Sequence, residues 1–82
     1  MDKQRKLAEL SYKGKWMVIR DQHKTNPYKI VYEFYADGAS GFGKHTKVMA
    51  RYEALTDAMY KLYELLWNMP SEWAQIVMGR RV

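Results

Sequence analysis

The sequence predicts an α+β domain in which a three-stranded antiparallel sheet is packed by one long amphipathic helix. Short helices are expected at both ends of the chain, which gives the order α-β-β-β-α-α. The strongest observation is a change of pattern: residues 45–52 alternate as a strand does, whereas the apolar residues of 55–66 recur with a helical period. Two extended segments, 13–21 and 28–36, precede this junction. We therefore expect one small sheet with a helix laid across it.

The N-terminal segment has the pattern of a short helix. Asp2 can cap a helix that runs to about Leu10, with Leu7 and Leu10 on one side and basic residues on the other. Residues 13–21 follow, and their alternation and β-branched and aromatic content predict a first strand whose two faces are both at least half covered.

The middle of the chain reads as two further strands joined by turns. A polar turn at 22–27 leads into a second strand at 28–36, which places Ile30, Tyr32 and Phe34 on the core side. Residues 37–43 are expected to form the loop of a hairpin, and residues 44–52 its returning strand.

A long helix is expected from about Ala54 to residue 67. Its aliphatic residues form a core stripe, at Leu55, Ala58, Met59, Leu62, Leu65 and Leu66. Pro70 should end this region, because proline cannot continue a helix. Residues 72–78 are then expected to form a short last helix that ends before Gly79.

Length and composition limit the classes of function. With 82 residues the chain should form one domain, 1–82, and with no cysteine it can have neither disulfides nor thiolate metal sites. The first ten residues are charged, and no apolar run approaches the roughly 18 residues of a membrane span. We expect neither a signal peptide nor a membrane helix, and a cytoplasmic location, which is the host cytoplasm if a phage encodes the protein.

No group of residues suggests catalysis. His23 and His45 are the only histidines, they lie in different expected elements, and no carboxylate or hydroxyl stands at a telling spacing from either. His23 is interpreted as a solvated turn residue and His45 as an outward strand residue. We therefore predict a protein that is not an enzyme and that has no catalytic residues, no cofactor and no metal.

The glycine-rich segment with Gly38, Gly41 and Gly43 before Lys44 invites comparison with phosphate-binding loops. Such loops lead from a strand into a helix, whereas this one leads into another strand, which favours a flexible hairpin loop. Phe42 stands at its expected tip, and an exposed aromatic on a loop often contacts a partner.

One face of the expected sheet combines basic and aromatic residues. The net charge of +5 would attract an acidic partner, and such a face could contact phosphates while an aromatic ring stacks. The residues expected to bind nucleic acid on this hypothesis are Arg20, Lys29, Tyr35, Lys47 and Arg51. The alternative is a solvated face whose charges, Glu33 included, pair across strands.

The long helix carries a second stripe, Tyr60, Tyr63 and Trp67, beside its core stripe. A two-layer fold needs only one apolar side of the helix. These aromatics either pack beneath the terminal helices or form an exposed anchor for a protein partner or a homodimer. Tyrosine and tryptophan are residue types that dominate binding energy at interfaces.

The strand-to-helix junction at 50–58 and the Gly-Lys-Trp at 14–16 resemble the arm-binding domains of phage-type integrases, over residues 13–66. The sheet of those domains enters the DNA major groove. The resemblance implies DNA contacts from Arg20, Lys29, Lys47 and Arg51. The chain departs from the family at 48–50, where Val-Met-Ala replaces a dense basic run. The element order is also similar to double-stranded RNA-binding domains, whose lysine-rich helix start is absent here.

In its general style the whole chain is similar to small phage accessory proteins that inhibit a host enzyme or a defence complex such as a CRISPR effector. It is compact and cysteine-free, and it is rich in tyrosine, methionine and tryptophan. This similarity implies a phage or mobile-element protein that masks a host protein or protein–nucleic acid complex through Tyr60, Tyr63, Trp67 and Phe42. The alternative is a DNA-binding module that uses the sheet face. No membrane partner is expected.

Overall fold

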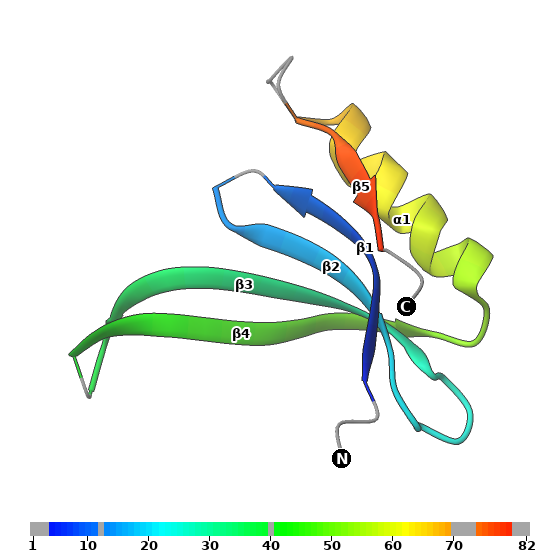
Figure 1. Cartoon of the computed structure of the whole chain (residues 1–82), viewed down its shortest axis with the longest axis horizontal. Coiled ribbons are helices and arrows are strands. Elements are labelled where there is room, and N and C mark those ends of the chain that lie inside the picture. The colour runs from blue at the N-terminus through cyan, green and yellow to red at the C-terminus, as the bar shows by residue number, and fades with distance from the viewer. Residues whose placement is uncertain (1–3, 12, 40, 70–73, 80–82) are drawn as a thin grey trace.

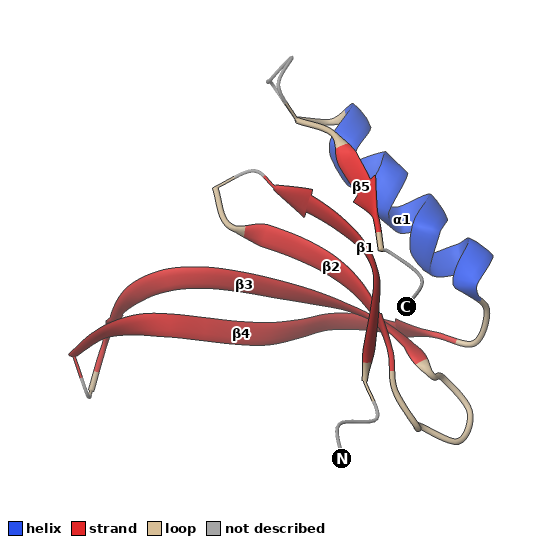
Figure 2. Ribbon diagram, viewed as in Figure 1, coloured by secondary structure: helices blue, strands red, loops and turns tan. Residues whose placement is uncertain are grey.

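The part of the chain that the structure describes forms a five-stranded antiparallel sheet with one helix packed on it (Figure 1; Figure 2). The computed structural model describes residues 4–11, 13–39, 41–69 and 74–79. Its elements are β1 (Arg5–Ser11), β2 (Lys15–Arg20), β3 (Tyr28–Gly38), β4 (Gly41–Tyr52), α1 (Leu55–Trp67) and β5 (Ile76–Met78). The strand order is β4-β3-β2-β1-β5, so the first four strands form a meander and α1 returns the chain to the far edge, where β5 pairs with β1.

The prediction of a three-stranded sheet with helices at both termini is wrong. The segment expected to be the first helix is strand β1, apart from residues 1–3, which lie outside the described residues. A one-residue bulge at Leu7 explains the misleading spacing: Lys6 pairs with Ile19 and Ala8 with Val18, so Leu7 has no partner on β2. Leu7, Ala8 and Leu10 all reach the core, which imitates the spacing of a helix face.

The expected last helix at 72–78 is also wrong where the structure describes it. Residues 72 and 73 lie outside the described residues, and Ile76–Met78 form strand β5. Leu10 pairs with Ile76 and Ala8 with Met78, and the amide of Gly79 donates to the carbonyl of Leu7 at 2.6 Å. Backbone groups of β1 that face away from β2 are satisfied in this way. A short segment gains more from completing this ladder than from an isolated helical turn.

The long helix is confirmed, and its core stripe faces the sheet. Strands are also confirmed within the three ranges expected for them. The core lies between α1 and one face of the sheet, and its fully buried residues are Ala8, Leu10, Val18, Ile30, Ala58 and Leu62. Of the three residues expected in the core from β3, Ile30 is buried, whereas Tyr32 and Phe34 are half-buried.

The hairpin of β3 and β4 extends beyond the rest of the sheet as a two-stranded ribbon (Figure 1). Strand β2 pairs with β3 only as far as Glu33, whereas β3 and β4 remain paired to Gly38 and Gly41. The expected loop at 37–43 is therefore mostly strand, and Phe42 lies within β4 rather than at a loop tip. The ribbon gives the molecule a projecting arm on the side away from β5.

The turn between β1 and β2 depends on Gly14. This residue has φ +121°, and a Cβ atom there would lie 2.7 Å from the carbonyl oxygen of Glu33. We expect Gly14→Ala to lower the free energy of unfolding by about 1–3 kcal/mol, because the strained backbone and the contact must both be accommodated. Urea unfolding of wild type and variant would measure this change in the free energy of unfolding. Gly43→Ala is the control, since nothing lies within 4 Å of that position; equal effects of the two variants would contradict the prediction.

Candidate interaction surfaces

The aromatic stripe of α1 is exposed on the side of the helix that faces away from the sheet. Ala58 and Leu62 are fully buried, whereas Tyr60 is 74%, Tyr63 53% and Trp67 90% exposed. Spacings of three, four and seven residues place the three aromatics on one helix face. The sequence left open whether these aromatics pack beneath the terminal helices or are exposed. In the structure they are exposed.

These side chains border a shallow groove of about 310 Å³, which Glu64 also lines. The Glu64 carboxylate accepts a hydrogen bond from Lys61 Nζ at 3.0 Å, which raises the pKa of Lys61 above its usual value. Its charge is thereby balanced within the helix. The groove therefore presents mainly aromatic surface beside a neutralised ion pair. We call Tyr60, Tyr63 and Trp67 the aromatic face of α1.

Phe42 does not join the aromatic face of α1. It is 72% exposed and stacks on Tyr35, with ring centroids 6.3 Å apart, near the end of the β3–β4 ribbon. Ile30 points toward α1, and side chains alternate along a strand, so Tyr35 lies on the opposite face of the sheet. The residues expected to bind protein therefore occupy two separate places.

The expected nucleic-acid face is divided between the two sides of the sheet. In β4, Ala50 pairs with Ile30 but Val48 pairs with Val31, so Met49 is an extra residue in a bulge. Every side chain before the bulge is thereby shifted to the other face relative to simple alternation. Lys47, opposite Tyr32, lies on the side of α1, whereas Arg51, opposite Lys29, lies on the other side.

The remaining residues of that set are dispersed as well. Arg20 pairs with Tyr28 and belongs to the side of α1, whereas Tyr35 lies on the opposite face, 64% exposed. Lys29 is only 8% exposed. These residues do not all line one outward face: the extra residue in β4 turns Lys47 to the side of α1, and the register of β2 on β3 places Arg20 there too.

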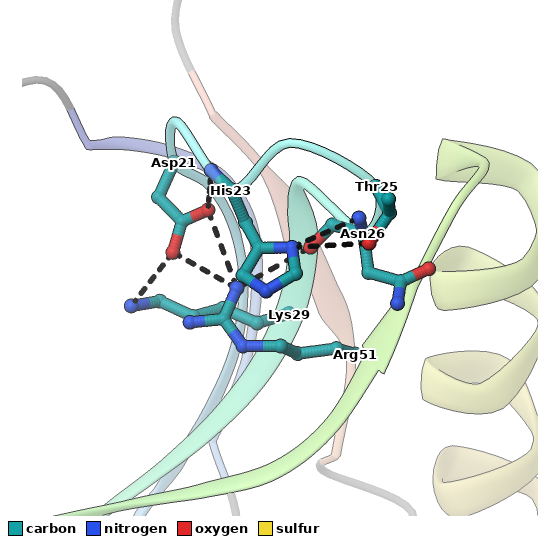
Figure 3. Close-up of polar contacts among 6 residues, drawn as sticks. All are labelled: Asp21, His23, Thr25, Asn26, Lys29 and Arg51. Carbon is teal, nitrogen blue, oxygen red and sulfur yellow. Dashed lines mark hydrogen bonds and ion pairs between the residues drawn. The ribbon is translucent and has the colours of Figure 1, made fainter.

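Asp21 forms an ion-pair network at the start of the β2–β3 turn (Figure 3). Its carboxylate lies 3.3 Å from Lys29 Nζ and 3.1 Å from Arg51 Nη1. It also accepts a hydrogen bond from the backbone amide of His23 at 3.0 Å. This amide, followed by the two cations, lowers the pKa of Asp21 below its usual value. Two of the basic residues assigned to DNA, Lys29 and Arg51, are thus paired with this one carboxylate, which balances one of their two charges.

The two histidines have structural partners. Nδ1 of His23 accepts a hydrogen bond from the amide of Asn26 at 3.1 Å and so closes the turn (Figure 3). Nε2 of His45 lies 3.1 Å from the carbonyl oxygen of Ala36, and its ring stacks on Phe34. Within the described parts of the chain, no three histidine, aspartate or glutamate side chains gather closely enough to hold a metal ion.

Sequence reasoning missed a hollow at the β2–β3 turn. Its volume is about 540 Å³, and its lining residues are Arg5, Arg20, Asp21, Gln22, His23, Lys24 and Pro27. Arg5 belongs to the segment that the sequence predicts as a terminal helix, so no sequence signal joins it to Arg20. The pairing of β1 with β2 brings them together, since they are direct partners across the two strands.

The described residues contain no helix with the length and apolar character needed to cross a membrane. Comparisons with models of protein families, with curated proteins and with solved structures found no match to this chain.

Proposed function

We propose that the protein is a non-enzymatic binding protein, encoded by a phage or mobile element, that masks a host protein through the aromatic face of α1. The observation that carries the proposal is the exposure of Tyr60, Tyr63 and Trp67 together on one helix face. Leaving three large aromatic side chains in water has no benefit for folding. Their retention on one surface is what a partner interface would require.

The chemistry of this face suits a protein partner better than a small molecule. The groove is shallow and about 310 Å³ in volume, and Trp67 projects from it with 90% of its surface exposed. A projecting ring of this kind can fill a pocket on a partner, where buried aromatic anchors contribute most of the binding energy. The net charge of +5 would speed encounter with an acidic partner surface.

The proposal predicts that truncating the aromatic face weakens partner binding without unfolding the protein. We expect Trp67→Ala and Tyr60→Ala each to reduce partner affinity by about tenfold or more. Stability should change by less than about 0.5 kcal/mol, because both side chains are exposed. The measurement is quantitative capture of bacterial host proteins on tagged wild type and variants, followed by titration of the purified partner and an assay of its inhibition.

Tyr35→Ala is the matched control, because it also removes an exposed tyrosine but from the opposite face of the sheet. Capture of the same protein by wild type and by Tyr35→Ala, with loss in both helix variants, would support the proposal. Equal capture by all variants would contradict it. Loss of capture only in Phe42→Ala would move the interface to the β3–β4 ribbon. A wild-type dimer that becomes monomeric in Trp67→Ala would assign the face to self-association instead.

A further inference from the structure

The hollow at the β2–β3 turn collects positive charge from two segments of the chain. Arg5 comes from β1, Arg20 from the end of β2, and Lys24 from the turn that follows. None of these three side chains forms an ion pair with an acidic residue in the part of the chain that the structure describes. At about 540 Å³ the hollow is in the size range of small-ligand sites.

The two arginines face each other directly. Arg5 and Arg20 are Cα partners on adjacent antiparallel strands, an arrangement that destabilises a sheet when both side chains carry the same charge. The guanidinium of Arg20 lies 5.8 Å from the centre of the Tyr28 ring, a contact that can orient it. A bound anion between the two guanidinium groups would convert this repulsion into two attractive contacts.

Asp21 lines the same hollow but does not neutralise it. Its carboxylate interacts with Lys29, Arg51 and the amide of His23 (Figure 3). Two cations thus already compensate the one negative charge. The hollow keeps the positive charges of Arg5, Arg20 and Lys24.

The turn can also contribute neutral hydrogen-bond donors. Because Nδ1 of His23 accepts from the amide of Asn26, the neutral ring carries its proton on Nε2. Gln22 supplies an amide group at the wall. Guanidinium groups bind phosphate with paired hydrogen bonds, which distinguishes them from lysine.

We propose that this hollow binds a small phosphate-bearing anion with at least two negative charges, such as a pyrophosphate or the phosphate chain of a nucleotide. Arg5 and Arg20 hold the anion between them, and Lys24 adds a third charge from the turn. The site is separate from the aromatic face of α1, and the proposal does not depend on the proposed protein partner.

The test is isothermal titration of the full chain with sodium pyrophosphate in a phosphate-free buffer, with sodium chloride at equal ionic strength as the reference. We expect saturable binding of one pyrophosphate per chain. Arg5→Gln and Arg20→Gln should each weaken this binding by about tenfold or more, because each removes charge-assisted hydrogen bonds. Lys24→Gln should weaken it less, and Lys44→Gln, which removes an exposed lysine of β4 outside the hollow, should bind like wild type.

Parallel titrations with a nucleoside triphosphate and with a single-stranded oligonucleotide distinguish the sources of phosphate. If the protein binds pyrophosphate or the triphosphate more tightly than it binds the oligonucleotide, per site, the hollow is a site for a small ligand. Binding of the oligonucleotide alone would overturn that assignment. The proposal is also wrong if pyrophosphate has no more effect than sodium chloride, or if Arg5→Gln and Arg20→Gln bind as wild type does.

Thermal unfolding gives a second readout, in which Arg5→Gln should raise stability although it weakens pyrophosphate binding. In phosphate-free, low-salt buffer, Arg5→Gln should raise the melting temperature by about 1–5 °C, because it removes a like-charge pair across the strands. Pyrophosphate should raise the melting temperature of wild type and leave that of Arg5→Gln nearly unchanged. A variant that is less stable than wild type without pyrophosphate would show that Arg5 has a structural role instead.

Discussion

Leu62→Ala should lower the free energy of unfolding by about 2–5 kcal/mol, the largest change that we expect from a single substitution. Leu62 is fully buried and belongs to the cluster that joins α1 to β1, β2 and β3. Truncation removes its apolar contacts and leaves a cavity between two layers that cannot easily close. Urea unfolding followed by tryptophan fluorescence would measure the loss.

Tyr63→Ala is the control for this experiment, because Tyr63 follows Leu62 on the same helix but is 53% exposed. It should change stability by less than about 0.5 kcal/mol. A loss below about 1 kcal/mol in Leu62→Ala would contradict the packing of α1 against the sheet. Similar losses in both variants would show that burial at position 62 is not what sets the stability of α1, because alanine is the better helix former at either position.

Asp21→Asn should have the second largest effect, a loss of about 2–4 kcal/mol at neutral pH. Asparagine keeps the size of the side chain but removes the charge that compensates Lys29, whose ammonium group lies 3.3 Å away. Lys29 would remain only 8% exposed without a counter-charge, and Arg51 would lose its carboxylate partner. Urea unfolding at pH 7 measures this loss.

The pH dependence of stability provides an independent check on Asp21. Its pKa in the folded protein is lowered, so its contribution is fully present above the usual value of about 3.8. That contribution is lost as the pH falls through the lower pKa of the folded state. Asp21→Asn has no carboxylate to protonate at this position. The stability difference between wild type and variant should therefore be constant near neutral pH and shrink below about pH 3.8.

Asp37→Asn is the control, since Asp37 is an exposed aspartate near the end of the β3–β4 ribbon. It should be nearly neutral at pH 7. A difference between wild type and Asp21→Asn that stays the same down to pH 2 would show that the carboxylate charge is not what stabilises the turn.

The elements that were predictable from sequence carry their signal within a few neighbouring residues. The stripe from Leu55 to Leu66 predicts α1 and its buried side, because burial of one helix face imposes that period. The aromatic face of α1 was visible as a second stripe. The sequence could not show whether this face is exposed, because its exposure depends on which segment packs on the outer side of the helix.

The terminal segments show where local patterns mislead. Residues 5–11 contain good helix formers with a helix-like spacing of apolar residues, yet they form β1. Pairing with β2 on one side and β5 on the other outweighs the weak preference of a short helix. Strand β5 lies far from β1 in the sequence. The balance between helix and strand therefore cannot be judged from residues 5–11 alone.

Two single-residue bulges decided the site geometry. The bulge at Met49 places Lys47 and Arg51 on opposite faces of the sheet, and the bulge at Leu7 sets the register of β1 on β2. Nothing in either segment marks the extra residue, because a bulge is defined by the partner strand as much as by its own sequence. The sequence therefore could not predict that Arg5 pairs with Arg20 across the two strands, or that they line a basic hollow.

The sequence by itself determined the position of α1, the central strands and the two stripes of the helix, because hydrophobic periodicity is a property of neighbouring residues. Only the tertiary structure decided the number of strands, the face on which each charge lies and the grouping of Arg5 with Arg20. The physical reason is that strand pairing joins residues far apart in the chain. Its register depends on hydrogen bonds and packing that exist only once the partner strands have met.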